Sequence, residues 1–367
     1  MSKQKIQISP LQLTFLSITM VVSTADIFTP SFVAQDAKRD SWLSAILASL
    51  AMIPVLLIQL GLYKQYKGKC LTEICIEIAG NFPGRIIAFL YSFYFIFVAI
   101  GAAVSLTIVL NITFLPLTPP RVIVVVSILV AMYGVYSGLE VIARVNEILL
   151  PAGMGALVFL LILNIGEYDF NYFRPVFEQG ILQPIRGAVV IFGYLCETVG
   201  LLQMFHLVSK QEKVNLAAFI GLLITGSAML AGTLIYAVFG PLTEIFVIPA
   251  LEMARFSSIG KYIQNLDVLI LAIWITGIYV KLMIYTYSGT YAMSVIFGLK
   301  NYKYVVLPVG FFICGVTISG LETIITELDF MHYIVPVYAI FMAVIIPGVL
   351  LLISKIIKRR KGEEPQK

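Results

Sequence analysis

Three ionisable residues lie inside long apolar stretches of this 367-residue sequence. Asp26 and Glu197 occupy two different stretches, and Lys281 lies deep within a third. A charged side chain at the centre of a bilayer costs roughly 2.5 to 3.5 kcal/mol on insertion scales, so such residues usually face a partner, an ion or a polar ligand. The pattern therefore predicts a polar binding site at the depth of the membrane centre.

The elements that would position these residues are membrane-spanning helices. The chain is 60% hydrophobic and only 12% charged, which excludes an ordinary soluble domain. Stretches of about 20 apolar residues are long enough to cross a bilayer as a helix. Ten such spans are expected, at residues 9–35, 41–63, 86–115, 120–138, 142–165, 184–207, 214–240, 264–297, 303–321 and 332–357. The fold class predicted is an all-α polytopic membrane protein.

Two of the spans contain residues that weaken a helix next to a carboxylate. In the first span, the small and polar run 23–26 precedes Pro30, which cannot donate a backbone hydrogen bond. In the sixth, Gly193 and Gly200 bracket Glu197, and Gly193 lies one turn from the carboxylate, where it would clear space beside it. Interrupted helices at both places are expected. The alternatives are a kinked, fully packed first helix and a protonated glutamate bonded to a neighbouring helix.

The order of the spans predicts two inverted five-helix repeats, at about 9–165 and 184–357, because each set of five opens with an interrupted helix. Residues 1–357 would form a single ten-helix domain, followed by a basic tail at 358–367. With the N-terminus inside, 17 Lys and Arg residues lie on the inner side and seven on the outer side. This asymmetry predicts that both termini are cytoplasmic.

Lys281 shares one helical face with Trp274, Tyr285 and Ser288, at spacings of seven, four and three residues. The face could line a ligand site or hold a purely structural ion pair, and the sequence leaves open whether Lys281 pairs with Asp26 or with Glu197. Tyr94 of the third span is a further candidate for the same site.

Other functional classes find little support. The two histidines lie far apart in the sequence, and the four cysteines form no paired motif, so no metal, cofactor or catalytic constellation is indicated and an enzyme is not expected. The basic run at the end of the last span is typical of a positive-inside anchor at the lipid bilayer, rather than of a nucleic-acid site.

Several motifs together resemble the B-subunit family of spore-germination nutrient receptors. Their order along the chain carries the resemblance, and they are Asn171–Val176 with Gly180, Gly193–Glu197, Ile248–Leu251, Ile263–Asp267 and Ile273–Ile275. The resemblance implies the ten-helix, LeuT-like fold of the amino acid, polyamine and organocation transporter superfamily. It also implies a multi-pass protein of the spore inner membrane, or cell membrane, that pairs with receptor subunits A and C.

The resemblance further implies that an amino acid or similar small nutrient binds near helices one and six and triggers germination. The residues expected around this ligand are Ser23, Thr24, Ala25, Asp26, Tyr94, Gly193, Leu195, Glu197, Lys281 and Tyr285. The acidic side chain of Asp26 departs from the glycines common in the family, and it could hold an ammonium group or another cation. The alternative function is a proton-coupled secondary transporter of amino acids.

Overall fold

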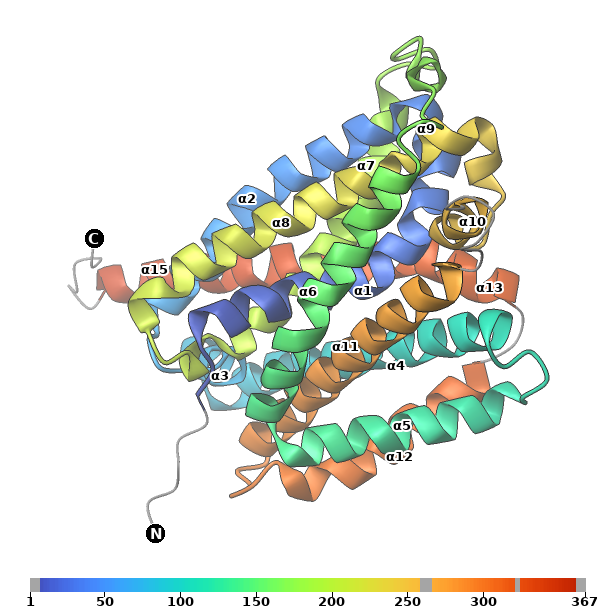
Figure 1. Cartoon of the computed structure of the whole chain (residues 1–367). Coiled ribbons are helices and arrows are strands. Elements are labelled where there is room, and N and C mark those ends of the chain that lie inside the picture. The colour runs from blue at the N-terminus through green and yellow to red at the C-terminus, as the bar shows by residue number, and fades with distance from the viewer. Residues whose placement is uncertain (1–6, 258–265, 321–323, 361–367) are drawn as a thin grey trace.

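The chain folds almost entirely into helices (Figure 1). The computed structural model describes residues 7–257, 266–320 and 324–360. Within these residues, nine helical segments are long and apolar enough to cross a membrane, and the first of them, Pro10–Gln65, contains two helices. The ten spans expected from the sequence are confirmed, and the chain is a multi-pass membrane protein.

The spans form two sets of five. The first set consists of α1 (Pro10–Ala37), α2 (Ser41–Gln65), α4 (Asn81–Thr113), α5 (Pro120–Ser137) and α6 (Leu139–Leu163). The second set consists of α7 (Leu182–Cys196) with the 3-10 helix η3 (Glu197–Gln203), then α8 (Val214–Thr233), α11 (Leu266–Ile296) and α12 (Lys303–Gly320). Its fifth span contains α13 (Ile324–Asp329), α14 (Val335–Ile340) and α15 (Ile346–Arg360), joined by two π-helical turns, η7 (Phe330–Ile334) and η8 (Phe341–Ile345).

Short helices connect the spans at both ends of the bundle. They are η1 (Lys38–Asp40), α3 (Leu71–Ala79), η2 (Phe170–Phe173), η4 (Phe205–Leu207), η5 (Gln211–Lys213), α9 (Ile235–Phe239), η6 (Gly240–Glu244) and α10 (Pro249–Phe256). The start of α1, the helix α3 and the end of α15 lie at one end of the bundle, whereas η2, α10 and α13 lie at the other (Figure 1). The expected motif at Ile263–Asp267 lies largely outside the described residues, as does most of the basic tail.

The two sets of helices pack against each other reciprocally. The first helix of each set lies along the second helix of the other, since α1 packs on α8 and α2 packs on α7. The third helices, α4 and α11, also pack against each other, and α6 and α14 each return to the first helix of their own set. This pattern is that of two inverted repeats, as the sequence predicts.

Helix α1 is the central element of the fold, and its start is fixed by its own sequence. Ser9 accepts a hydrogen bond from the Gln12 backbone N–H at 3.0 Å, and the Gln12 side chain accepts one from the Ser9 N–H at 2.9 Å. Pro10 occupies the first helical position, where its missing N–H costs nothing. Nearly every residue that follows in α1 is buried, so this helix is surrounded by protein rather than lipid.

The predicted interruption of the first span is wrong, because α1 is continuous from Pro10 to Ala37 with Pro30 inside it. Pro30 has no backbone N–H, so the Asp26 carbonyl lacks the hydrogen bond that residue 30 would otherwise donate. The neighbouring helices pack against α1 and hold the rest of it in place. The Ser23 hydroxyl donates to the Thr19 carbonyl at 2.7 Å and so follows the helix. The interruption of the sixth span is confirmed, since α7 ends at Cys196 and a tighter 3-10 helix begins at Glu197.

Candidate functional site

A buried ion pair joins three membrane-spanning helices at the middle of the fold. The Lys281 ammonium of α11 donates to the Glu197 carboxylate at 2.6 Å and to the Thr24 hydroxyl of α1 at 2.5 Å. Both charged side chains are 3% exposed or less. In a low-dielectric interior each charge compensates the other, and removal of one would leave the other buried without a partner.

The change from α7 to η3 positions Glu197. Where the α-helical pattern ends, the Glu197 carbonyl accepts a hydrogen bond from the Tyr285 hydroxyl of α11 at 2.8 Å. Three residues on, Gly200 lies so close to α1 that an added Cβ would stand 2.4 Å from Met20 Cε and 3.3 Å from the Tyr285 ring. The glycine therefore lets η3 approach α1 and α11 closely enough for the ion pair to form.

A cavity of about 30 Å³ lies beside the ion pair, and we name it the ion-pair cavity. Its lining comes from α1, α4, α7, η3, α11 and the last span, and comprises Thr24, Phe28, Phe97, Val98, Gly101, Ala102, Ser105, Tyr194, Glu197, Lys281, Met331 and Val335. The space corresponds to about two water molecules at roughly 10–15 Å³ each. A nutrient molecule would therefore have to move side chains apart in order to enter.

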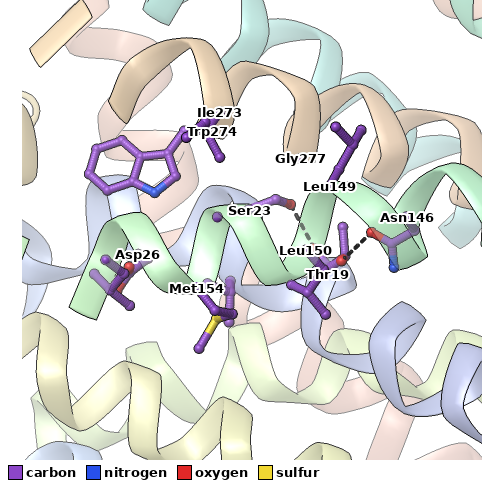
Figure 2. A pocket seen from close by; sticks show the side chains of 13 residues that line it. Thr19, Ser23, Asp26, Asn146, Leu149, Leu150, Met154, Ile273, Trp274 and Gly277 are labelled. Atoms are coloured by element: carbon purple, nitrogen blue, oxygen red, sulfur yellow. Dashed lines mark hydrogen bonds between the residues drawn. The ribbon is translucent and has the colours of Figure 1, made fainter. Parts of the chain in front are cut away.

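A second cavity, of about 40 Å³, lies on another face of α1, and we name it the Asp26 cavity. Residues of α1, α6 and α11 line it, including Ser23, Asp26, Asn146 and Trp274. Figure 2 shows Asp26 and the Trp274 indole at one end of this cavity, and Thr19 with Asn146 at the other. The same two turns of α1 thus contribute residues to two separate sites.

The structure divides the predicted site residues between the two cavities. Thr24, Glu197 and Lys281 line the ion-pair cavity, whereas Ser23 and Asp26 line the Asp26 cavity. The choice that the sequence leaves open is answered, because Lys281 pairs with Glu197.

Five of the predicted residues are buried but line neither cavity, and they are Ala25, Tyr94, Gly193, Leu195 and Tyr285. Gly193 faces Pro336, since an added Cβ would lie 2.3 Å from the Pro336 Cα. The space it provides is therefore filled by the last span rather than left beside the carboxylate of Glu197. Tyr94 packs edge-on against the Tyr338 ring, with the centroids 5.4 Å apart.

Asn146 and Thr19 are residues of the Asp26 cavity that sequence reasoning missed. The Thr19 hydroxyl donates to Asn146 Oδ1 at 2.7 Å, and Asn146 is 1% exposed. A signal was present, because Asn146 lies within the apolar span 142–165 and is the kind of intramembrane polar residue that usually has a partner. The aromatic and aliphatic lining of the ion-pair cavity carries no such signal, since Phe97 and Met331 look like ordinary core residues.

The fold and these sites define a class of protein. Solved structures with similar folds include MhsT in complex with L-phenylalanine, with a TM-score of 0.66 and 14% identity over 96% of this chain and 99% of that one. Mhp1, a nucleobase-cation-symport-1 family transporter, gives a TM-score of 0.65 and 14% identity over 97% and 80% of the two chains. The chain has the LeuT-like fold of these proteins.

Sequence comparison identifies the family within this class. The model of the family described as "Spore germination protein" matches residues 7–323, and the chain belongs to that family. The Bacillus subtilis protein YfkT is 30% identical over 332 residues, which cover 89% of this chain and 90% of YfkT. Spore germination protein KB of Bacillus subtilis is 26% identical over 99% of this chain and 100% of its own length. The chain is thus a germination-related membrane protein.

Proposed function

We propose that this chain is the membrane subunit of a spore germinant receptor, and that it binds an amino acid or similar small nutrient at the ion-pair cavity. The observation that carries the proposal is the buried Lys281–Glu197 pair beside a cavity at the junction of α1, η3 and α11. An amino acid carries an ammonium group, which Glu197 could bind in place of Lys281. It also carries a carboxylate, which Lys281 could bind in place of Glu197. Membership of the spore germination family supports the biological role.

Binding in this manner would move helices. The ion-pair cavity has room for about two water molecules, so a zwitterion that inserts between the two charges must separate α11 from η3. Two hydrogen bonds would then break or change partners. One joins the Lys281 ammonium to the Thr24 hydroxyl, and the other joins the Tyr285 hydroxyl to the Glu197 carbonyl. A ligand can drive such a change only through its higher affinity for the opened state, and that difference would be the germination signal.

The proposal includes the location and the partners of the chain. We place it in the spore inner membrane with both termini in the cytoplasm, which the excess of Lys and Arg on that side supports. We also propose that its protein partners are the A and C subunits of a germinant receptor. The resemblance of this chain to the B-subunit family, together with its membership of the spore germination family, supports this assignment. The nutrient would enter from the end of the bundle formed by η2, α10 and α13, opposite to the start of α1 and the end of α15 (Figure 1).

The test is nutrient-triggered germination of spores in which this chain carries Lys281→Met or Glu197→Gln. We expect the response to a nutrient that acts through this receptor to fall about tenfold or more, as the loss of ~1.4 kcal/mol of ligand affinity would produce. Subunit levels are measured on immunoblots. Lys69→Met is the control, because it breaks an exposed ion pair with Glu77 outside the spans. Normal responses at normal protein levels in both variants would refute the site.

Proton-coupled transport of an amino acid is the second candidate function, and the transporter-type fold favours it. Uptake into proteoliposomes distinguishes the two. Stoichiometric uptake that an uncoupler abolishes would indicate a transporter, whereas ligand binding without uptake would indicate a sensor.

A further inference from the structure

An open groove runs between α2 and α8 on the outside of the bundle. The two helices pack against each other and lie side by side along one face of the molecule (Figure 1). The groove has a volume of about 310 Å³, and we name it the α2–α8 groove. Leu50 of α2 and Leu223 of α8 both line it and are 58% and 72% exposed. The groove therefore opens on the surface of the membrane-spanning part, where the protein meets lipid.

The lining of the groove suits a hydrocarbon chain. None of the described residues that line it carries a charge. The Ser49 hydroxyl donates to the Ala45 carbonyl of its own helix at 2.8 Å. The Ser227 hydroxyl likewise donates to the Leu223 carbonyl at 2.9 Å. Because these bonds use both hydroxyl protons, the described lining has no side-chain donor left for a polar ligand.

The length of the groove corresponds to one leaflet of the bilayer. Its lining residues lie between positions 45 and 53 of α2 and between positions 219 and 230 of α8. At 1.5 Å per residue these stretches are about 12 Å and about 16 Å long. Half of a hydrocarbon core of about 30 Å is about 15 Å. A single acyl chain of one leaflet therefore matches the groove in length.

Trp42 marks the end of the groove that lies near the lipid headgroups. It precedes Ile46, Ser49 and Ile53 by four, seven and eleven residues, so it lies on the same face of α2, one turn closer to the start of the helix. Tryptophan is enriched where the hydrocarbon core meets the headgroups. The groove thus begins just below the headgroups on the side of the membrane where α2 starts, which is the outer leaflet in the orientation proposed above.

A membrane-spanning helix of a partner protein fits the groove less well than an acyl chain does. Such a helix is about 10–12 Å across with its side chains, and it crosses the whole hydrocarbon core. The groove covers only half of that depth, and Gly226 in its floor already lies against α2, since an added Cβ would stand 2.7 Å from Ser49 Oγ. A flexible alkyl chain can follow the groove and supply the dispersion contacts that its two walls otherwise lack.

We propose that the α2–α8 groove binds one acyl chain of a phospholipid, which stays with the protein while the surrounding lipids exchange. The groove lies between the helix that packs along α7 and the helix that packs along α1. A chain bound there stabilises the contact between the two five-helix sets. The site is independent of the nutrient site, because no described residue lines both the groove and the ion-pair cavity.

The experiment uses the purified full-length chain, taken from nanodiscs of phosphatidylglycerol and phosphatidylcholine into detergent. Native mass spectrometry counts the phospholipid molecules that each chain retains. We expect about one retained phospholipid per wild-type chain, and a melting temperature that rises when phosphatidylglycerol is added back, because a ligand that binds only the folded state stabilises it. A wild-type chain that retains no phospholipid would overturn the proposal.

Ser227→Phe connects the retained lipid to the groove, because it adds bulk from an exposed position on the groove wall. We expect its affinity for phosphatidylglycerol, titrated in the same spectrometer, to fall at least about tenfold. Ser319→Phe is the matched control and should bind as the wild type does. Ser319 is also exposed, lies in α12 away from the groove, and donates its hydroxyl to the Gly315 carbonyl at 2.9 Å.

Leu223→Trp adds bulk to the same wall and serves as the second variant if Ser227→Phe does not fold. Equal lipid affinity in the groove variants and in Ser319→Phe would overturn the proposal. Loss of co-purifying receptor subunits in Ser227→Phe, together with a wild-type chain free of lipid, would also overturn it and would assign the groove to a helix of a partner. None of these results depends on nutrient binding.

Discussion

Asp26 and Glu197 make a direct comparison within one molecule. Each carboxylate lies in the first span of its five-helix set, and each is 2% exposed. Glu197 lies where α7 changes to a 3-10 helix and pairs with Lys281. Asp26 lies within a continuous helix and faces a cavity, and its carboxylate has no hydrogen-bond partner among the residues that the structure describes. The difference shows that position in a repeat does not set the role of a buried charge. The role of each buried charge is set by the partner that the other helices place beside it.

The largest effect is expected from Lys281→Met, which keeps the length of the side chain and removes its charge. Glu197 would remain buried without its partner, so the free energy of unfolding should fall by about 3 to 5 kcal/mol. Reversible unfolding in mixed micelles with increasing denaturing detergent measures this change.

The exposed pair Lys69–Glu77 provides the control for Lys281→Met. Lys69→Met should cost about 0.2 to 1 kcal/mol, because an exposed ion pair contributes little. The double variant Glu197→Gln with Lys281→Met should recover part of the loss, with an interaction energy on the order of 0.5 to 3 kcal/mol. Strictly additive losses would mean that the pair does not contribute as a unit.

Thr24→Val tests the hydroxyl that joins α1 to the ion pair. The substitution is nearly isosteric and removes a hydrogen bond to a charged group, so we expect a loss of roughly 1.5 to 3 kcal/mol in the same unfolding measurement. Thr225→Val is the matched control, since the Thr225 hydroxyl donates to the Gly221 carbonyl of its own helix. Equal losses of unfolding free energy in the two variants would show that the hydrogen bond from Lys281 to the Thr24 hydroxyl adds no stability beyond that of an ordinary bond within a helix.

Gly232→Ala tests the space around Asp26. The new methyl group would stand 2.8 Å from Asp26 Oδ1, and overpacking of this kind typically costs about 1 to 3 kcal/mol. Gly348→Ala has open space around its Cβ and should be neutral or slightly stabilising. A Gly232→Ala protein as stable as the wild type would mean that Asp26 moves freely away from α8.

The smallest effect is expected from Asp26→Asn in a buffer that contains N-methyl-D-glucamine as its only cation. Within the described part of the chain the carboxylate has no hydrogen-bond partner to lose, so the free energy of unfolding should change by less than about 1 kcal/mol. Glu197→Gln in the same buffer should destabilise the protein strongly. A large loss of unfolding free energy in Asp26→Asn would show that Asp26, like Glu197, contributes strongly to stability.

The sequence predicts much of the fold because its signals are local. Ten apolar stretches correspond to the ten spans, and the helix-weakening glycines around Glu197 mark the change at Cys196. The prediction for the first span failed, because it treated Pro30 as a break although proline removes a single hydrogen bond that packing can replace. Local residue types therefore indicate where a helix is weak, and tertiary contacts decide whether it opens.

The candidate site is predictable only in part. The rule that intramembrane charges usually face a partner or a ligand selects Asp26, Glu197 and Lys281 as candidates without any structure. It could not decide which carboxylate Lys281 reaches, because residues 84 positions apart meet only through the packing of α11 against η3. For the same reason it assigned Ser23 and Thr24 to a single site, whereas these neighbouring residues point into different cavities.

The most direct test of nutrient binding at the ion-pair cavity is equilibrium binding of the twenty proteinogenic amino acids to the purified chain, compared among wild type, Lys281→Met and Asp26→Asn. We expect that at least one amino acid binds the wild type, that its affinity falls about tenfold or more in Lys281→Met, and that it changes less than about threefold in Asp26→Asn. Retained binding in Lys281→Met together with loss in Asp26→Asn would contradict it, and would move the nutrient to the Asp26 cavity.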